Sequence, residues 1–257
     1  MRAALEKRGP VPRCQDLSLA CDAERVTVAF HVEKVTRSCL ERAERVMREA
    51  GLDGAVVAPQ EGRAQLIGEA LLSEEAPFGA PARLYGRADL FAQANRATNA
   101  KLVELALEGL GRPGSVLELF AGAGNFTFAI ALRGARVIAV ESSSEALELA
   151  RRSAREAGVG SVRFAQGDAL ALAGALAREG TRFEALLLDP PRVGAKGVGA
   201  VAAALGVTRV VYVSCDPATL ARDARELCQA GFSGRWAVPV DMFPQTCHVE
   251  GVLVLER

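Results

Sequence analysis

From about residue 115 onward, short apolar runs alternate with stretches whose apolar residues recur at helical spacing. The apolar runs predict strands at residues 115–120, 136–140, 161–165, 184–188 and 208–213. The stretches between them predict helices at residues 126–132, 144–157, 170–178, 198–205 and 217–230, with Ser143 or Ser144 as the N-cap of the second. This alternation is typical of a parallel sheet covered by helices.

Two later apolar runs, residues 234–240 and 249–255, have no helical pattern between them. We therefore expect them to form an antiparallel pair at one end of the sheet. Together the seven runs predict an α/β fold with a Rossmann-like, doubly wound sheet. The expected domain covers residues 89–257.

Before residue 88 the pattern differs and predicts a small N-terminal α/β domain, residues 1–88. Residues 25–32 alternate apolar and polar side chains, as a half-exposed strand does, and residues 38–50 carry an apolar stripe at helical spacing. Residues 55–58 and 65–72 are further predicted strands. Pro77, Gly79 and Pro81 are expected to mark the exit from this domain.

Composition narrows the class of protein. The 257 residues carry no net charge, which argues against binding nucleic acid through overall electrostatics but leaves a local basic surface open. No apolar run approaches the roughly 18 residues of a membrane span, and the N-terminal residues lack the apolar core of a secretory signal. The six cysteines include no C-x-x-C pair, so no metal site is expected. We expect a cytoplasmic monomer without a membrane or protein partner.

A candidate site for a methyl donor follows the first three strands of the large domain. Gly122 and Gly124 allow a tight turn before a helix, and Thr127 occupies the position where a dinucleotide fingerprint has a third glycine. Glu141 ends the second strand, where a carboxylate can bind ribose hydroxyls, and Asp168 follows the third. Their order favours S-adenosylmethionine over NAD, the alternative being a plain turn with solvated strand ends.

A candidate acceptor site follows the fourth and fifth strands. Asp189-Pro190-Pro191-Arg192 ends the fourth, and Cys215 ends the fifth just before a helix predicted to begin at Pro217, whose N-terminus should lower the thiol pKa. Glu250 lies in the last segment. A thiolate that adds to C6 of uracil activates C5 toward a methyl group, and a base must then remove the C5 proton. Cys215 and Glu250 suit these two steps. His248 is the alternative base, unless it is only structural or a substrate contact, and a buried, inert Cys215 is the structural alternative. Cys228 is expected in the core, and Cys247 has no assigned role.

Residues 89–257 resemble the RNA uracil-5-methyltransferases, which form 5-methyluridine in ribosomal and transfer RNA. The matching segments are residues 91–95, residues 117–127, Asp189-Pro190-Pro191-Arg192, residues 214–223 and residues 243–250 with the tail at residues 253–257. The resemblance implies that Cys215 is the nucleophile and Glu250 the base. It implies a donor pocket lined by Gln93, Phe120, Asn125, Glu141 and Asp168, with Asp189 between donor and uracil, and Gln93 also touching the base. A target uridine would have to leave its stack.

Three departures from the family pattern bear on function. The first 88 residues do not predict the β-barrel RNA-binding domain with which typical members begin, and they look like a shortened central domain. Cys14, Cys21 and Cys39 are too far apart for the iron–sulfur motif of many members, so we expect no cluster. Asp216 replaces a frequent asparagine. A non-catalytic RNA-binding or assembly factor on the same fold therefore remains the alternative, followed by methylation of a different substrate.

Overall fold

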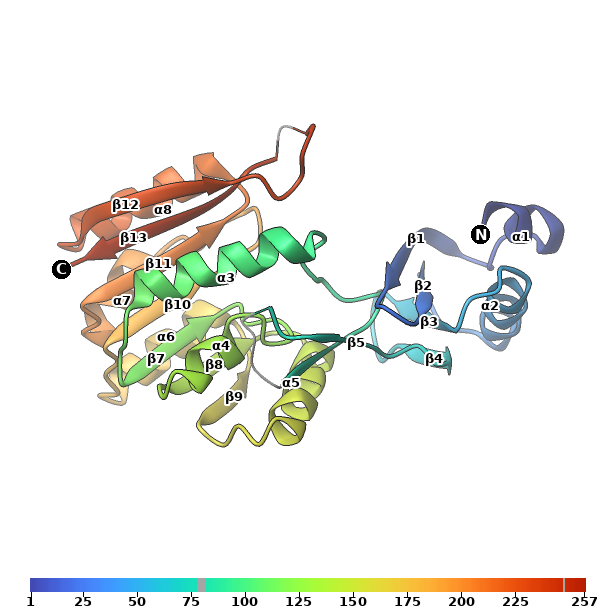
Figure 1. Cartoon of the computed structure of the whole chain (residues 1–257), viewed down its shortest axis with the longest axis horizontal. Helices are drawn as coiled ribbons and strands as arrows, with labels where there is room; N and C mark the ends of the chain where they lie inside the picture. The colour runs from blue at the N-terminus through green and yellow to red at the C-terminus, as the bar shows by residue number, and fades with distance from the viewer. Residues whose placement is uncertain (78–81, 247) are drawn as a thin grey trace. The chain divides into compact units, whose positions relative to one another are not determined.

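Seven strands form the large sheet, in the order β12-β13-β11-β10-β7-β8-β9 (Figure 1). A computed structural model describes residues 1–77, 82–246 and 248–257. The elements of this part are α3 (Arg96–Leu110), β7 (Ser115–Leu119), α4 (Thr127–Leu132), β8 (Arg136–Glu141), α5 (Ser144–Glu156), β9 (Val162–Gln166), α6 (Ala169–Arg178), β10 (Ala185–Leu188), α7 (Val198–Leu205), β11 (Arg209–Ser214), α8 (Pro217–Gln229), β12 (Ser233–Val240) and β13 (Glu250–Glu256). The predicted seven-stranded Rossmann-like sheet is confirmed.

The directions of the strands decide which side chains share an edge of the sheet. Strands β9, β8, β7, β10 and β11 are parallel, whereas β13 runs antiparallel to β11 and pairs with β12 as the predicted terminal hairpin. The sheet changes winding direction between β7 and β10, which are neighbours. Ligands of such sheets bind beyond the carboxyl ends of the strands at this point. The N-terminal end of β13 lies at the same edge, because it is antiparallel.

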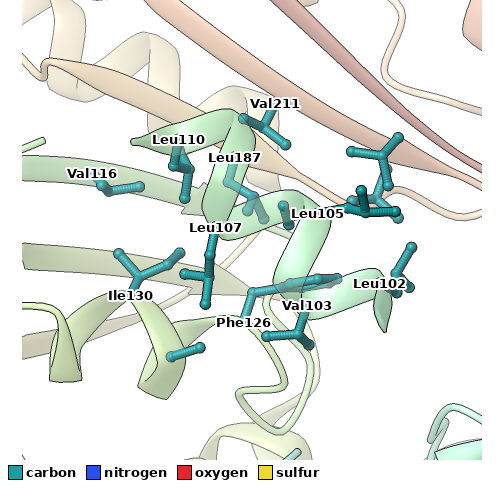
Figure 2. Close-up of a cluster of buried hydrophobic side chains, with 14 of the residues drawn as sticks. Leu102, Val103, Leu105, Leu107, Leu110, Val116, Phe126, Ile130, Leu187 and Val211 are labelled. Carbon is teal, nitrogen blue, oxygen red and sulfur yellow. The ribbon is translucent and has the colours of Figure 1, made fainter. Parts of the chain in front are cut away.

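Two apolar clusters hold helices to the two faces of the sheet. One packs α3 and α4 against β7, β10 and β11, with Leu102, Val103 and Phe126 among its buried side chains (Figure 2). The other packs α6, α7 and α8 against the opposite face, with Leu186, Tyr212 and Leu227 fully buried. Burying a large apolar side chain contributes about 1.5–3 kcal/mol, so these clusters set which face each helix covers.

Helix α3 was not among the predicted helices. Its buried residues include Leu102, Val103, Leu105, Ala106 and Leu107, so apolar positions surround more than one face and the usual stripe is blurred. A capping signal was present nevertheless, since the Asn95 side chain accepts a hydrogen bond from the Thr98 N–H. The helix brings the segment that begins at Gln93 into the larger of the two compact units described below.

Several other helices begin where the sequence places a capping side chain. Ser143, rather than Ser144, caps α5 by accepting from the Ala146 N–H at 3.1 Å. Asp168 caps α6 and Asp216 caps α8 in the same way. None of the helices in the described residues is both long and apolar enough to cross a membrane.

The N-terminal elements form a second sheet, in the order β1-β2-β3-β4. The strands of this sheet are β1 (Cys14–Cys21), β2 (Val26–Val32), β3 (Gly54–Pro59) and β4 (Gln65–Gly68), and the helices of the same region are α1 (Arg2–Arg8) and α2 (Arg37–Glu49). A two-stranded sheet of β5 (Leu72–Glu75) and β6 (Arg83–Gly86) follows. The prediction of one strand at residues 65–72 was wrong, because Gly68 adopts a positive φ of 64° and ends β4.

The chain divides into two compact units, one of Met1–Glu74 with Arg83–Ala92 and one of Glu75–Ala82 with Gln93–Arg257. The expected exit marked by Pro77, Gly79 and Pro81 falls here, and Gly79 and Pro81 lie outside the described residues. The functional division at residues 88 and 89 stays a prediction.

Candidate active site

A thiol and two carboxyl side chains lie at the ends of neighbouring strands along one edge of the large sheet. Ser214 pairs with Gly251, so Cys215 and Glu250 lie at adjoining ends of β11 and β13. Leu188 pairs with Tyr212, so Asp189 leaves β10 beside β11. Glu250 is buried and Cys215 partly buried. The structure therefore brings together a thiol and two carboxyls from segments far apart in the sequence.

Burial and mutual repulsion shape the protonation of this group. Burial raises the pKa of Glu250. Burial, followed by the neighbouring Glu250 charge, raises the pKa of Asp189 to about 7. Near neutral pH the Asp189 carboxyl is therefore partly protonated, and a carboxyl shifted in this way is typical of acid–base sites.

The prediction that the helix N-terminus lowers the pKa of Cys215 was wrong. Its pKa is raised, first by burial and then by the charges of Glu250 and Asp189, and Arg192 only partly offsets them. The helix does begin at Pro217 as expected. Two carboxylates and the loss of solvent outweigh it, so the free thiol is held protonated.

Asp216 has a clear local task. Its carboxylate accepts a hydrogen bond from the Thr219 N–H at 2.8 Å, and this bond lowers the pKa of Asp216. Asparagine and aspartate are comparable N-cap residues, so the substitution of one for the other preserves the start of α8.

On the donor side, Glu141 fixes the glycine turn. One oxygen accepts from the Gly122 N–H at 2.9 Å. The other accepts from the Ser142 and Ser143 N–H groups and from the Ser142 hydroxyl. These bonds orient the carboxylate at the end of β8, and the oxygen bound to Gly122 retains a lone pair for a further donor.

The turn between β7 and α4 has an unusual backbone. Phe120, Gly122 and Gly124 all adopt positive φ, at 62°, 56° and 100°. A Cβ added at Gly122 would meet no other described atom within 4 Å, whereas one at Gly124 would lie 2.3 Å from the Phe128 ring. Gly122 thus borders open space that a ligand can approach, and Gly124 is required by packing. A strained Phe120 at such a turn is typical of a functional site.

Two predicted donor residues have protein partners. Asp168 accepts from the Ala171 N–H at 2.8 Å as the cap of α6, and its proposed bond to an adenine amine stays a prediction. Asn125 exchanges two hydrogen bonds with Asn99 of α3, each 2.9 Å. Asn99 is buried and was missed by the sequence analysis, as was the helix that carries it.

A buried carboxyl was also missed. Glu118 of β7 is fully buried, and neither oxygen has a hydrogen-bond partner among the described residues. Burial raises its pKa to about 8, and the charges of Asp189 and Glu141 add to this. The nearby Thr127 partly offsets the shift, although its hydroxyl does not reach hydrogen-bond geometry. A lone glutamate inside the apolar run of residues 115–120 was the available signal.

Gln93, like Glu118 and Thr127, has an unpaired buried polar atom among the described residues. Its side-chain oxygen is buried without a partner in the described part of the chain. Unpaired buried polar atoms are costly, and they fit a site that a polar ligand completes. The donor-side residues therefore fit S-adenosylmethionine, which carries an ammonium group, ribose hydroxyls and an adenine amine.

The remaining predicted residues lie at the margin. Arg192 is exposed, and its charge acts on both Cys215 and Asp216. His248 is exposed and meets the Phe243 ring edge-on at 6.3 Å. Cys247 lies outside the described residues. Cys228 was expected in the core, which was wrong: it lies on the exposed side of α8, beside the buried Leu227.

Comparison with known proteins gives this geometry a context. A family model described as tRNA (Uracil-5-)-methyltransferase matches residues 17–257. A 23S rRNA (uracil(1939)-C(5))-methyltransferase RlmD of Pseudomonas entomophila is 40% identical over 242 residues, which are 91% of this chain and 52% of that protein. The RlmD of Alkalilimnicola ehrlichii is 46% identical over 179 residues, 68% of this chain and 40% of that protein. The chain thus spans about half the length of these relatives.

Solved structures agree on the fold. The tRNA (uracil-54, C5)-methyltransferase of Pyrococcus abyssi, in complex with S-adenosyl-L-homocysteine, superposes with a TM-score of 0.69 at 24% identity, covering 91% of this chain and 56% of that one. A SAM-dependent methyltransferase of Agrobacterium tumefaciens gives 0.59 at 14% identity, covering 95% and 91%. Identities this low speak for the fold alone.

Proposed function

Because this chain belongs to the tRNA (uracil-5-)-methyltransferase family, we propose that it transfers a methyl group from S-adenosylmethionine to C5 of a uridine in RNA. The observation that carries the proposal is the pairing of β11 with β13, which sets Cys215 beside Glu250 next to Asp189. A ring-carbon methylation needs both a nucleophile and a base at one place.

In the proposed reaction Cys215 adds as a thiolate to C6 of the uracil. The electron pair of the C5–C6 double bond moves toward C5 and O4, which makes C5 nucleophilic. S-adenosylmethionine, when bound, supplies the electrophilic methyl group that C5 takes. Glu250 then removes the C5 proton, the double bond re-forms, and the Cys215 thiolate leaves. The Cys215 thiol gives up its proton to solvent as it adds, and the C5 proton taken by Glu250 passes back to the departing thiolate. One proton is therefore released for each methyl group transferred, and both residues return to their starting forms.

The raised pKa of the Cys215 thiol is compatible with this reaction cycle. Glu250 and Asp189 raise the pKa of Cys215, so a thiolate is disfavoured until substrate arrives. Adding to C6 disperses the sulfur's negative charge into the uracil. The repulsion from the two carboxylates is then relieved, which favours the adduct over the free thiolate.

The donor pocket is proposed to consist of Gln93, Phe120, Gly122, Gly124, Asn125, Glu141, Asp168 and Asp189. The turn open at Gly122, the oriented Glu141 carboxylate and the orphaned Glu118 and Gln93 oxygens support it. Glu118 is an addition to the predicted set. We propose no iron–sulfur cluster.

Gln93, Asp189 and Arg192 are proposed to contact the RNA, with Arg192 exposed where a phosphate or carbonyl could bind. We propose residues 1–88 as an RNA-facing domain and residues 89–257 as the catalytic domain. The proposed setting is the cytoplasm, with the chain acting as a monomer.

The test is mass spectrometry of RNA after incubation with the protein and S-adenosylmethionine. Unmodified 23S rRNA and unmodified tRNA are offered separately, because the relatives' names divide between these substrates. One new 5-methyluridine in either RNA supports the proposal. RNA binding without any methylation, and without affinity for S-adenosylhomocysteine, would instead favour the non-catalytic RNA-binding or assembly factor.

A further inference from the structure

A buried carboxylate outside the proposed catalytic set joins three elements behind the acceptor site. Asp223 of α8 is fully buried. One oxygen accepts from the Tyr212 hydroxyl of β11 and from the Ala195 N–H, each at 2.6 Å. The other accepts from the Arg222 guanidinium at 2.7 Å. Burial and Asp223 raise the pKa of Tyr212, so its hydroxyl stays protonated and donates.

The same face of α8 holds the loop after β10 at two further points. Arg222 donates to the Val193 carbonyl at 2.9 Å, and Glu226 accepts from the Gly197 N–H at 2.6 Å. Gly194 has a positive φ of 73°, and a Cβ there would come within 2.5 Å of both Arg222 and Asp223. The loop is therefore pressed closely onto the helix along residues 193–197.

Both segments held by this network lead into the acceptor site. The loop begins at Asp189 and Arg192, and α8 begins two residues after Cys215. Tyr212 lies three residues before Cys215 on the strand itself. A buried polar network with its donors and acceptors satisfied favours one arrangement of the groups it joins. Asp223 therefore ties the segment carrying Asp189 to the segments on both sides of Cys215.

We propose that Asp223 is a positioning residue, which fixes Asp189 and Arg192 relative to Cys215 through the loop of residues 189–197. It touches neither substrate nor donor in this role. The inference rests on the proposed function only for what Asp189, Arg192 and Cys215 do. The spacing itself can be measured without any methyl transfer.

Alkylation of Cys215 reports that spacing, since Asp189 raises and Arg192 lowers the pKa of the thiol, with Asp189 the larger influence. The rate of iodoacetamide labelling of the Cys215 peptide is followed by mass spectrometry against pH. In Asp223→Asn and in Arg222→Ala the loop is released, and Asp189 moves away from the thiol. The midpoint pH, at which the labelling rate is half its maximum, should then fall by about half a unit.

These two variants change the local charge in opposite directions. Simple electrostatics would lower the midpoint in Asp223→Asn and raise it in Arg222→Ala, so a fall in both points to the loop. Arg222 is partly exposed, with 40% of its side chain accessible, so its replacement keeps the test available if Asp223→Asn fails to fold. Arg225→Ala removes an exposed arginine from the same helix and should leave the midpoint unchanged.

Activity gives the second readout. Both variants should lose about tenfold or more in kcat while keeping wild-type affinity for S-adenosylhomocysteine, because a displaced reacting group slows the reaction without emptying the donor site. Midpoints that move in opposite directions, or activity that falls only with the folded fraction, would overturn the proposal. An inactive wild type with the expected midpoint shifts would count against the proposed function and leave the positioning role standing.

Discussion

Asn99 and Asn125 form a reciprocal pair, in which each side-chain amide donates one hydrogen bond of 2.9 Å to the other. Asn99 lies on α3 and Asn125 in the turn that precedes α4. Because each amide uses its oxygen and one N–H on the other, the pair fixes the orientation of Asn125, which is one of the proposed donor-site residues.

This pair predicts strong coupling between two substitutions. Asn99→Ala should lower the free energy of unfolding by about 1–3 kcal/mol, because it leaves the Asn125 amide without a partner. It should also weaken S-adenosylhomocysteine binding about tenfold, a loss of about 1.4 kcal/mol, as Asn125 loses its fixed orientation. Urea unfolding followed by the fluorescence of Trp236, the single tryptophan, gives the first number and calorimetry the second.

The double variant tests whether the two residues act as a unit. If they do, Asn125→Ala should cost little more once Asn99 is already alanine. Lys101→Ala removes an exposed ion pair with Glu104 on the same helix and serves as the control. Additive losses, or unchanged binding in Asn99→Ala, would show that the pair does not organise the donor site.

The glycine turn gives a second prediction, based on what a methyl group would meet. Gly122→Ala should cost about 1 kcal/mol of stability, because alanine is strained at this positive φ. It should also abolish most S-adenosylhomocysteine affinity, because the new Cβ projects into the open space at the turn that the ligand is proposed to occupy. Gly124→Ala should cost clearly more, about 1–3 kcal/mol beyond the backbone strain, because its Cβ would collide with Phe128.

Gly134→Ala is the matched control for the turn. It too has a positive φ, at 95°, with no described atom within 4 Å of an added Cβ, and it lies after α4 rather than before it. It should therefore lose stability as Gly122→Ala does and still bind S-adenosylhomocysteine normally. Equal loss of binding in both variants would remove Gly122 from the proposed pocket.

The buried Glu118 predicts how stability depends on pH. Folding raises its pKa from an ordinary 4.5 to about 8, so the folded state holds this proton longer than the unfolded state. Its contribution to stability is full below about 4.5 and is lost as pH rises through about 8. Between these two pH values, one such group lowers the free energy of unfolding by about 1.4 kcal/mol for each pH unit.

Glu118→Gln should flatten this profile. The variant cannot ionise, so it should be more stable than the wild type at pH 9, on the order of 5 kcal/mol, and similar at pH 4. Urea unfolding across pH, again followed by Trp236, measures both. Glu104→Gln, at an exposed position of α3, should keep the wild-type profile. Parallel profiles for Glu118→Gln and wild type would mean that folding does not raise the pKa of Glu118.

Much of the larger fold was predictable because its strands are short, apolar and separated by clear helical patterns. The positions of the seven strands along the chain, the terminal hairpin and the start of α8 at Pro217 all followed from this pattern. Helix α3 did not, because it is buried on more than one side. The break at Gly68 was missed because a single glycine in an apolar run does not reveal its φ.

The residues of the candidate site were easier to predict than their burial, their hydrogen-bond partners and their pKa shifts. Asp189 and Cys215 follow neighbouring strands, and Glu250 begins the strand beside them, as expected of side chains that meet at one edge of a sheet. The pKa of Cys215 was predicted in the wrong direction, because the sequence does not show how far the thiol is buried, and burial raises its pKa most. Glu118, Asn99 and Asp223 matter through their burial, and Asn99 and Asp223 also through partners from distant segments, which no local pattern records.

In the proposed reaction Cys215 bonds to C6 of the uracil, and Glu250 removes the C5 proton so that the thiolate can leave. The most direct measurement uses RNA carrying 5-fluorouridine, with S-adenosylmethionine, and maps any protein–RNA adduct by mass spectrometry. Fluorine at C5 cannot leave as a proton does, so a methylated adduct on Cys215 should accumulate with the wild type. Glu250→Gln should accumulate the same methylated adduct with ordinary uridine, and Cys215→Ser neither. Full methylation by Cys215→Ser, or an adduct on another residue, would contradict the claim.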